Sequence, residues 1–438
     1  MDKLIIEGGV SLRGDVPISG AKNAALPILI ATLLAPGEHM IHNVPELVDI
    51  STTLSLLGRI GCPSLVAGAR VKLDTSRVAF SEAPYDLVRK MRASVLTLGP
   101  LLARCGEAKV SLPGGCAIGV RPIDQHLKGL EALGCEFVLE KGYVHGRVDH
   151  LKGAEIHLDV PTVTGTENIL MAAVLAEGIT QIHNAAREPE IVDLAKFLKS
   201  MGARITGEGT SVIVVDGVPA LRPARTPHAI LSDRIEAGTY LVAGAITGGE
   251  IRITNAPVAH ISAVLEALEA AGCDIEVDGD AVTLSRPGPV RPVSVSTAPH
   301  PGFPTDMQAQ FMALMSLAQG RCTLEETIFE NRFMHVPELC RLGADVSTLG
   351  NTAHINGVDA LQGATVMATD LRASASLVLA GLAAGGQTEV LRLYHLDRGY
   401  EHLVQKLRNV GARLARVPQD TALPVGALSE RQAAQQTA

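Results

Sequence analysis

Residues 264–273 read VLEALEAAGC, and this segment is one of six copies of the pattern on which the architecture depends. Apolar residues recur at helical spacing up to Gly272, and a glycine directly after a helix suits the left-handed conformation that ends it. The copies end at Gly61, Gly134, Gly202, Gly272, Gly343 and Gly411, with spacings of 73, 68, 70, 71 and 68 residues. Such a period predicts a fold built from repeats of one structural unit.

A second glycine series lies half a period away and closes an Ala/Leu-rich segment in each copy. Its members are Gly37, Gly106, Gly178, Gly249, Gly320 and Gly386. The segments before them, such as NILMAAVLAEG at 168–178, are apolar nearly all round, which predicts buried helices. Strand-like runs follow, such as EIRITNA at 250–256. Each unit therefore reads helix, strand, helix, strand, strand, and six units predict an α/β protein with two domains of three units each.

The composition of the 438-residue chain excludes several classes of protein. Aromatic residues make up 3% and the net charge is −8, which disfavours base stacking and nonspecific nucleic-acid binding. The seven cysteines lack CxxC spacing and the 14 histidines lack HxxxH spacing, so we expect neither a disulfide framework nor a metal site. We find no signal peptide and no apolar run long enough to span a bilayer, so we expect a cytoplasmic protein without a membrane partner. The polar tail at 419–438 is expected to be flexible.

Charged residues gather at one position of the repeat, the start of each buried helix. The six residues there are Lys22, Arg92, Thr164, Arg234, Asp306 and Arg372. Helix N-termini carry unpaired N–H groups and the positive end of the helix dipole, so a further cation is unfavourable unless an anion binds there. Helix capping alone would also place polar residues at these starts. The repeated cations favour an anionic ligand, and Asp306 is either a salt-bridge partner or a base for a hydroxyl group.

One thiol has an unusual setting. Cys116 lies in SLPGGCAIGVRPID at 111–124, after two glycines and five residues before Arg121. Glycine lets the loop bend, and a nearby cation lowers the pKa of a thiol, so we predict a reactive cysteine, with an inert loop cysteine as the alternative. Core positions are expected instead for the cysteines that follow repeat glycines, Cys62, Cys135 and Cys273.

Several longer motifs, in order along the chain, carry a family resemblance. They include SGAKNAALPIL at 19–29, the Cys116 segment, NAAREPEIVD at 184–193, PTDMQAQ at 304–310, ENRFMHVPEL at 330–339, MATDLRASASLVLAG at 367–381 and YHLDRGYE at 394–401. Together they resemble the bacterial UDP-N-acetylglucosamine 1-carboxyvinyltransferases, a family of enolpyruvyl transferases, from residue 1 to about 416. The related shikimate-pathway enzymes lack the loop that contains Cys116, so the resemblance favours the nucleotide-sugar family.

The resemblance implies two inside-out α/β barrel domains, each of three repeats. It places residues 22–230 in a first domain that carries the Cys116 loop, and residues 1–21 and 231–418 in a second domain that carries Asp306. It implies transfer of the enolpyruvyl group of phosphoenolpyruvate to the 3-hydroxyl of UDP-N-acetylglucosamine, with release of phosphate and without a metal or other cofactor. In the family this reaction is the first committed step of peptidoglycan synthesis.

The same resemblance assigns roles to individual residues. Cys116 would donate a proton to phosphoenolpyruvate and form a covalent adduct, and Asp306 would accept the proton of the sugar hydroxyl. Lys22, Asn23 and Arg398 join them as catalytic residues, with Asn23 steadying the tetrahedral intermediate. Substrate contacts are expected from Lys22, Asn23, Arg92, Arg121, Pro122, Ile123, Asp124, Gln125, Val163, Asp306, Ile328, Arg332, Arg372 and Arg398. Arginine forks suit both the carboxylate and the phosphate of phosphoenolpyruvate.

Two other functions stay open at this point. One is a noncatalytic relative that senses the nucleotide sugar, and the other is an enolpyruvyl transferase with a different acceptor. A sensor has no need of a proton donor, so the presence of Cys116 together with Asp306, Lys22 and Arg398 argues against the first. The oligomeric state is not indicated by the sequence.

Overall fold

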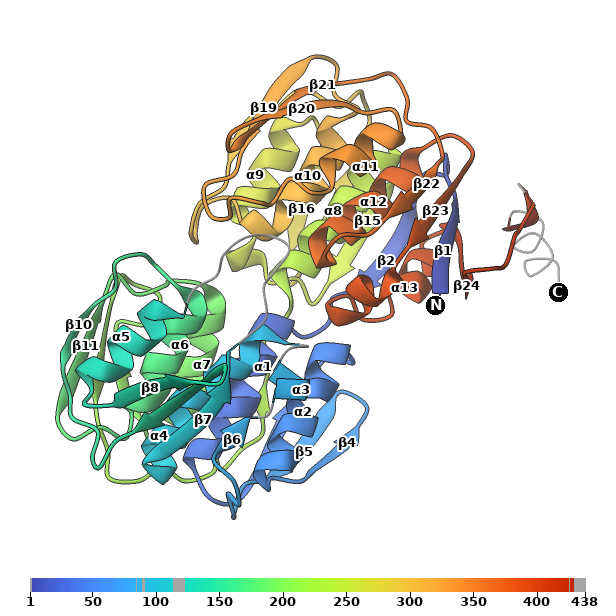
Figure 1. The fold of residues 1–438 in the computed structure, drawn as a ribbon. Coiled ribbons are helices and arrows are strands. Elements are labelled where there is room, and N and C mark those ends of the chain that lie inside the picture. Colours follow the sequence, from blue (N-terminus) through green and yellow to red (C-terminus); the bar gives the residue numbers. More distant parts are fainter. Residues whose placement is uncertain (1, 84, 89–90, 113–122, 425, 429–438) are drawn as a thin grey trace. The chain divides into compact units, whose positions relative to one another are not determined.

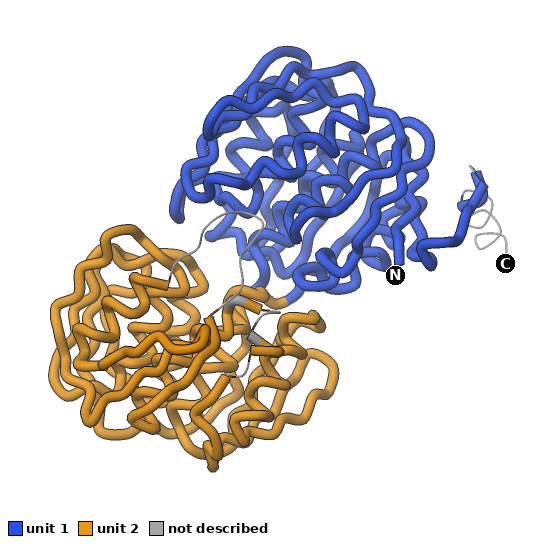
Figure 2. Tube along the Cα trace, viewed as in Figure 1, with its two compact units in different colours: residues 1–19, 116–120, 232–438 blue, residues 20–115, 121–231 orange. Residues whose placement is uncertain are grey.

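The computed structural model describes residues 2–83, 85–88, 91–112, 123–424 and 426–428 (Figure 1). The chain divides into two compact units (Figure 2). Unit 1 comprises the first 19 residues and the chain from Ser232 onward, and unit 2 comprises the described residues from Gly20 to Leu231. No helix in the described part of the chain is both long enough and apolar enough to cross a bilayer.

Six four-stranded sheets are present among the described residues, three in each unit. In every sheet one edge strand runs parallel to its neighbour, and the remaining pairs are antiparallel. The sheets of unit 2, in spatial order, are β14 (His228–Ala229), β3 (Glu38–His42), β5 (Arg70–Asp74), β4 (Ser64–Ala67); β6 (Glu82–Ala83), β7 (Glu107–Ser111), β9 (Tyr143–Arg147), β8 (Glu136–Glu140); and β10 (Glu155–His157), β11 (Ile179–His183), β13 (Val212–Asp216), β12 (Arg204–Thr206). Those of unit 1 are β2 (Arg13–Pro17), β15 (Glu250–Thr254), β17 (Ala281–Ser285), β16 (Asp274–Asp278); β18 (Val295–Ser296), β19 (Arg321–Glu325), β21 (Thr352–Asn356), β20 (Asp345–Leu349); and β22 (Thr365–Met367), β23 (Gln387–Leu391), β1 (Asp2–Glu7), β24 (Arg413–Pro418).

Each repeat also contributes one buried and one outer helix. The buried helices are α1 (Lys22–Ala31), α4 (Leu98–Cys105) and α6 (Val163–Ala173) in unit 2, and α8 (Arg234–Thr247), α10 (Gln308–Met315) and α12 (Leu371–Ala383) in unit 1. The outer helices are α2 (Val48–Ile60), α5 (Asp124–Ala132), α7 (Pro189–Ser200), α9 (Ser262–Ala270), α11 (Val336–Arg341) and α13 (Leu403–Asn409). Shorter helical segments are η1 (Thr32–Leu34), α3 (Tyr85–Val88), η2 (Arg92–Thr97), η3 (Val258–His260), η4 (Thr305–Met307) and η5 (Leu393–Arg398).

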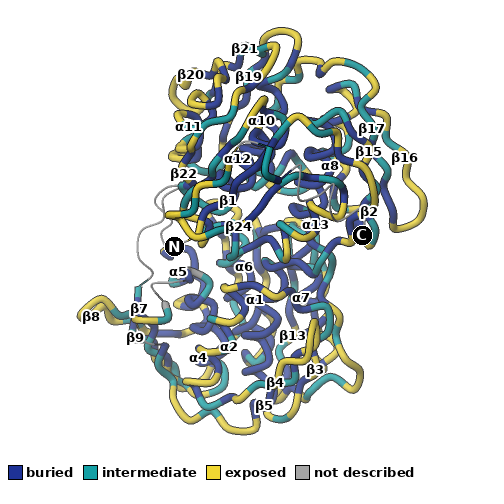
Figure 3. The backbone as a smooth tube through the Cα atoms, turned by 90° about the vertical axis from the view of Figure 1, so that its right-hand side faces the viewer, coloured by how far each residue is buried: buried dark blue, intermediate teal, exposed yellow. Residues whose placement is uncertain are grey.

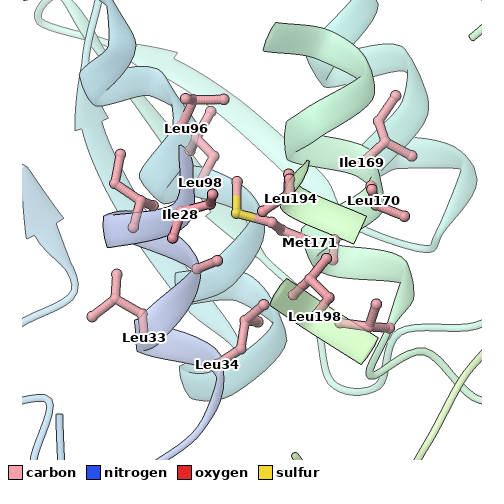
Figure 4. Close-up of a cluster of buried hydrophobic side chains, with 14 of the residues drawn as sticks. Ile28, Leu33, Leu34, Leu96, Leu98, Ile169, Leu170, Met171, Leu194 and Leu198 are labelled. Carbon is pink, nitrogen blue, oxygen red and sulfur yellow. The ribbon is translucent and has the colours of Figure 1, made fainter. Parts of the chain in front are cut away.

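The core of each unit is built around its buried helices, with the sheets outside them (Figure 3). In Figure 4, Met171 of α6 lies among Ile28 of α1, Leu98 of α4, and Leu194 and Leu198 of α7, and all five are fully buried. This arrangement confirms the predicted α/β class and the prediction that helices apolar all round lie inside.

The repeat pattern predicted from the sequence lacked one element. In each repeat a short strand precedes the buried helix. This strand pairs in parallel with an inner strand of a sheet, as β10 does with β11. Five of the six parallel edge strands, all except β2, have only two or three residues. Runs of that length carry no measurable alternation of polar and apolar residues, so the sequence pattern could not reveal them.

The first glycine series behaves as predicted, but the second does so only in part. All six glycines of the first series have positive φ, from 92° at Gly343 to 109° at Gly61. In the second series, Gly106 directly follows its buried helix, whereas the helices end three or more residues before Gly37, Gly178, Gly320 and Gly386. In the fourth copy of the second series, Gly248 ends α8 in the left-handed conformation, and not Gly249 as expected. Gly249 is needed for a different reason, because a Cβ there would lie 2.0 Å from the carbonyl oxygen of Leu12.

The ends of the chain meet in one sheet of unit 1. The first strand, β1, pairs on one side with β23 and on the other with the last strand, β24. The described part of the C-terminal tail lies against β1, because Glu7 Oε1 accepts hydrogen bonds from the backbone N–H groups of Gly426 and Leu428. Leu428 also packs with Ile5.

Candidate active site

Three of the predicted site residues lie together in unit 1, namely Asp306, Arg332 and Arg372. Asp306 is in the short helical segment η4, which leads into α10. Arg332 Nη2 donates to Asp306 Oδ1 at 2.7 Å, and Arg372 donates to Asp306 Oδ2 from Nη2 at 3.0 Å and from Nε at 3.2 Å. Burial raises the pKa of the Asp306 carboxyl, but the two guanidinium groups together outweigh it and hold that pKa well below its ordinary value. The salt-bridge role that the sequence left open is therefore confirmed, and the carboxylate is ionised.

Arg372 carries a hydrogen-bond donor beyond those used by Asp306. Its Nη1 is buried and makes no hydrogen bond of good geometry among the described residues, while the guanidinium also interacts with the Tyr400 side chain. The guanidinium lies over the ring of Tyr400, 5.3 Å from the centroid, and Gln310 Nε2 donates to the Tyr400 hydroxyl at 3.1 Å. A buried charged donor without a partner is unfavourable unless a ligand satisfies it. The Nη1 of Arg372 therefore indicates a place for an anionic ligand.

One buried carboxylate holds the loop after β19 against the same turn. Glu326 accepts from Thr305 Oγ1 at 2.8 Å and from the backbone N–H groups of Ile328 and Phe329 at 2.8 and 3.1 Å. Arg332 Nη1 donates to Thr305 Oγ1 at 2.9 Å. The backbone at Ile328, a predicted nucleotide contact, is thus linked to Arg332 through two side chains.

Arg398 lies on the segment that supports Arg372. It is the last residue of η5, which packs against α12 and is followed two residues later by Tyr400. The Nη1 and Nη2 atoms of Arg416 donate to the two carboxylate oxygens of Asp397 at 2.7 and 2.9 Å. This bidentate pair anchors η5 directly before Arg398.

Lys22 and Asn23 begin the buried helix α1 in unit 2. Lys22 Nζ lies 3.4 Å from Asp49 Oδ2, and the two residues are 9% and 3% exposed. The N-cap residue of α1 is Ala21, which offers no side-chain cap to the first N–H groups of the helix. A lysine at a helix start of this kind favours an anion beside it. Asn23 is half-buried at the next position.

A polar network fixes the start of α5, where further predicted contacts lie. Gln125 Nε2 donates to Asp159 Oδ2 at 2.9 Å, and the backbone N–H of Asp159 donates to Gln125 Oε1 at 2.9 Å. Gln125 Nε2 also donates to Asp124 Oδ2 at 3.1 Å. Hydrogen bonds from Lys128 and from Gln125 lower the pKa of Asp159. Ile123 precedes the helix and is 9% exposed.

The start of α6 is held next to α5. Val163 is the first residue of α6 and is half-buried. Thr162 Oγ1 accepts from the backbone N–H of Gly165 at 3.2 Å. The hydroxyl of Thr164 lies 3.1 Å from His126 Nε2 of α5, within hydrogen-bond distance. The predicted contacts Val163 and Gln125 are therefore on neighbouring helices.

Four predicted site residues cannot be compared with the structure. Cys116, Arg121 and Pro122 lie outside the described residues. Arg92 begins η2, as its position in the repeat predicts, but its side chain is outside the described part. The roles assigned to these four residues stay predictions.

The cysteines expected in the core are buried there. Burial raises the pKa values of Cys62, Cys135 and Cys273 to about 11, 12 and 11, so these residues are protonated thiols at neutral pH. Among the described residues, the exposed cysteines are Cys105 and Cys340. Burial raises the pKa of Cys105 as well.

The sequence analysis missed the residues that hold the site residues in place. Asp49 of α2 pairs with Lys22 of α1. Glu326 holds the backbone at Ile328, and Tyr400 lies against Arg372. A buried acid on the apolar face of a helix is a detectable signal, and Asp49 fits it because it lies one residue into α2 and next to Ile50. Glu326 and Tyr400 lie in irregular segments, where spacing does not show which side chains turn inward.

Comparisons of the sequence with known proteins find carboxyvinyltransferases. The family model described as EPSP synthase (3-phosphoshikimate 1-carboxyvinyltransferase) matches residues 6–407. A protein of Sorangium cellulosum named UDP-N-acetylglucosamine 1-carboxyvinyltransferase is 59% identical over 419 residues, which covers 95% of this chain and 99% of that protein. A protein of the same name from Desulfovibrio desulfuricans is 58% identical, covering 96% and 100%.

Solved structures show the same fold. The enolpyruvyl transferase NikO from Streptomyces tendae superposes with a TM-score of 0.86 at 27% identity, covering 95% of this chain and 99% of NikO. EPSP synthase from Acinetobacter baumannii has a TM-score of 0.73 at 18% identity, covering 95% and 100%, and supports the fold alone. The prediction of two repeat-built α/β domains is confirmed.

Proposed function

This chain belongs to the UDP-N-acetylglucosamine 1-carboxyvinyltransferase family, and from that premise we propose that it transfers the enolpyruvyl group of phosphoenolpyruvate to the 3-hydroxyl of UDP-N-acetylglucosamine and releases phosphate. The observation that carries this proposal is the 59% identity over 95% of the chain. The reaction is the first committed step of peptidoglycan synthesis. The protein then works in the cytoplasm, contributes to cell-wall biogenesis, cell shape and cell division, and is a target of fosfomycin.

The chemistry is an addition followed by an elimination. The methylene carbon of phosphoenolpyruvate takes up a proton while the sugar oxygen bonds to the neighbouring carbon, which gives a tetrahedral intermediate. Loss of a proton from the new methyl group and departure of phosphate restore the double bond. The protein must therefore supply a proton donor, a proton acceptor and cations for the carboxylate and phosphate.

Asp306 is the proton acceptor in this proposal. The two arginines keep it ionised, which is the form that can accept a proton, but they also make it a weak base. A weak base is sufficient here, because the hydroxyl becomes strongly acidic once its oxygen has begun to bond to carbon. Asp306 thus orients the hydroxyl as a hydrogen-bond acceptor and takes the proton late in the addition step.

Arg372 supplies cationic charge to the ligand. Its buried Nη1 is a preorganised donor for a carboxylate or phosphate oxygen, while its other N–H groups stay on Asp306. Arg398, Arg332 and Lys22 add positive charge from their own elements. Since these groups are already buried or anchored, binding requires little ordering of long side chains.

Cys116 is the proton donor and the residue that forms the covalent adduct. A thiol can donate its proton to the methylene carbon, and its thiolate can attack the central carbon of phosphoenolpyruvate. Asn23 contacts the tetrahedral intermediate. Both roles rest on the family motif in which the residues lie.

A phosphate-release assay tests the proposed function. The purified chain is given phosphoenolpyruvate with UDP-N-acetylglucosamine, and in parallel with other hydroxyl acceptors. We expect phosphate release only with the nucleotide sugar. Release with a different acceptor would assign another substrate, and binding of the nucleotide sugar without release would identify a sensor.

A second experiment tests the role of Cys116. The epoxide phosphonate fosfomycin is expected to alkylate Cys116, located by peptide mass mapping, and Cys116→Ser is expected to fold normally and lose turnover. The exposed Cys105 and Cys340 give matched controls, since their serine variants should keep full activity and sensitivity. Modification at either of these cysteines in place of Cys116 would overturn the assignment.

A further inference from the structure

A cluster of three metal-ligand side chains lies on the solvent face of the sheet that contains β10 and β11 in unit 2. Glu155 and His157 are two residues apart on β10, so their side chains leave the same face of the strand. His157 and His183 are direct neighbours in the parallel β10–β11 register. Their rings stack with centroids 4.3 Å apart and an interplanar angle of 9°. Figure 1 shows these two strands side by side.

The carboxylate of Glu155 faces both imidazoles. Glu155 Oε1 lies 3.1 Å from His157 Nε2 and 3.3 Å from His183 Nε2, and the ligand atoms of all three residues lie within 4.8 Å of one another. The contact to His183 lacks hydrogen-bond geometry, and His183 Nε2 has no hydrogen-bond partner among the described residues. The lone pair of this buried nitrogen is therefore available to a ligand.

We propose that Glu155, His157 and His183 bind a divalent transition-metal ion of the zinc class. Ligands at about 2.0–2.1 Å from a tetrahedral ion are separated from one another by about 3.3 Å. The two separations at Glu155 Oε1 match this edge length. Because both strands are paired in a sheet, the backbone holds the three ligands close together. The stacked rings are nearly parallel, so one imidazole rotates out of the stack when both lone pairs point at the same ion.

The ligand set decides the class of metal. Two imidazoles and one carboxylate suit Zn²⁺, Ni²⁺ or Cu²⁺, whereas Mg²⁺ and Ca²⁺ prefer oxygen ligands throughout. The side chains of Glu155 and His157 are 64% and 66% exposed, so solvent can enter and occupy the remaining coordination position. His183 is 27% exposed and anchors the inner side of the site.

This site is separate from the proposed catalytic residues. None of its three ligands is a predicted substrate contact, and the inference holds whether or not the proposed function does. The expectation of no metal site rested on the HxxxH spacing of helical sites. Here the two histidines are 26 residues apart in sequence and become neighbours only through strand pairing.

Metal binding by the full chain tests the proposal. Chelator-treated protein is titrated with Zn²⁺ by equilibrium dialysis, and the coordination of Cu²⁺ is followed by electron paramagnetic resonance. We compare wild type with His157→Ala, His183→Ala and Glu155→Gln. His150→Ala is the matched control, an exposed histidine of the same unit outside the cluster. Circular dichroism in the presence of chelator checks that all variants are folded.

We expect wild type to bind one Zn²⁺ per chain. The affinity for Zn²⁺ should fall at least about tenfold in His157→Ala and in His183→Ala, because even the loss of a residue that only hydrogen-bonds to a ligand reduces metal affinity about 10–100-fold. The Cu²⁺ spectrum should show two coupled nitrogens in wild type and one in each single histidine variant. The His150→Ala control should match wild type. Absence of binding, binding unchanged in the cluster variants, or an equal loss in the control would each overturn the proposal.

Discussion

Replacing Asp306 by asparagine removes the charge that holds two buried guanidinium groups together. Arg332 and Arg372 are 6% and 4% exposed at the side chain, and Asp306 is 25% exposed. Removal of one partner from a buried ion pair costs about 3–5 kcal/mol, because the other charge stays buried without compensation. Water can reach a quarter of the Asp306 side chain, so we expect a loss of about 2–4 kcal/mol in the free energy of unfolding of unit 1.

The pH dependence of this effect has a defined sign. The pKa of Asp306 is held well below its ordinary value, so near pH 4 the folded state binds fewer protons than the unfolded state. The stabilisation by the carboxylate is therefore complete above the unfolded pKa of about 3.9 and is lost as pH falls through the folded pKa. The difference between wild type and Asp306→Asn should be constant near neutral pH and should shrink only in acid.

Urea unfolding followed by circular dichroism measures this difference at pH 7 and at a series of lower pH values. Asp15→Asn is a matched control, because Asp15 forms an exposed pair with Arg252 at 3.4 Å in the same unit. Exposed pairs contribute about 0–1 kcal/mol, so the control should change little. A loss for Asp306→Asn no larger than that of the control, or a loss that grows in acid, would refute the assignment of a half-buried, ionised carboxylate paired with two buried arginines.

Three further predictions concern separate parts of the chain. Burial raises the pKa of Glu236 to about 7, although Lys406 opposes this shift. The free energy of unfolding should therefore fall as pH rises from about 4.3 to 7. Glu236→Gln should flatten this pH dependence in thermal unfolding, and an unchanged slope would contradict the prediction. A Cβ on Gly129 would lie 2.1 Å from Ile169 Cδ1, so Gly129→Ala should lower the free energy of unfolding of unit 2 by about 1–3 kcal/mol. In the double variant with Ile169→Ala, the loss of stability should be smaller than the sum of the two single losses. Additive losses would argue against this contact. Lys22→Ala should lower kcat/KM for phosphoenolpyruvate about 10–100-fold in the phosphate-release assay, because a charge-assisted hydrogen bond is lost. An unchanged kcat/KM would show that Lys22 is not part of the site.

The repeat could be predicted from the sequence because it depends on short-range sequence patterns. Helical spacing of apolar residues and a following glycine act over about ten residues, and Gly343 shows the outcome with a φ of 92°. The same logic located the helix starts, where Lys22 and Arg234 are the first residues of α1 and α8. Local chemistry thus indicates where these helices begin and where the first glycine series ends the outer helices.

The partners of the site residues could not be predicted, because they depend on contacts distant in sequence. Asp306 and Arg372 are 66 residues apart and meet only when neighbouring repeats pack. Glu155 and His183 likewise come together through strand register. Spacing within one element cannot indicate such pairs, and the family resemblance supplied the site residues without their supporting partners.

The packing of unit 1 explains why one copy of the repeat carries an acid at the helix start. The helices α8, α10 and α12 pack against one another, and hydrogen bonds from Arg372 to Asp306 show that the starts of α12 and α10 lie together. Helix starts are positive, so Arg332 and Arg372 would repel one another and the helix dipoles if no anion were present. Asp306 supplies that negative charge permanently, while Arg372 Nη1 stays available to a ligand. The exceptional residue of the series is therefore the one that allows a cationic site to remain assembled between reaction cycles.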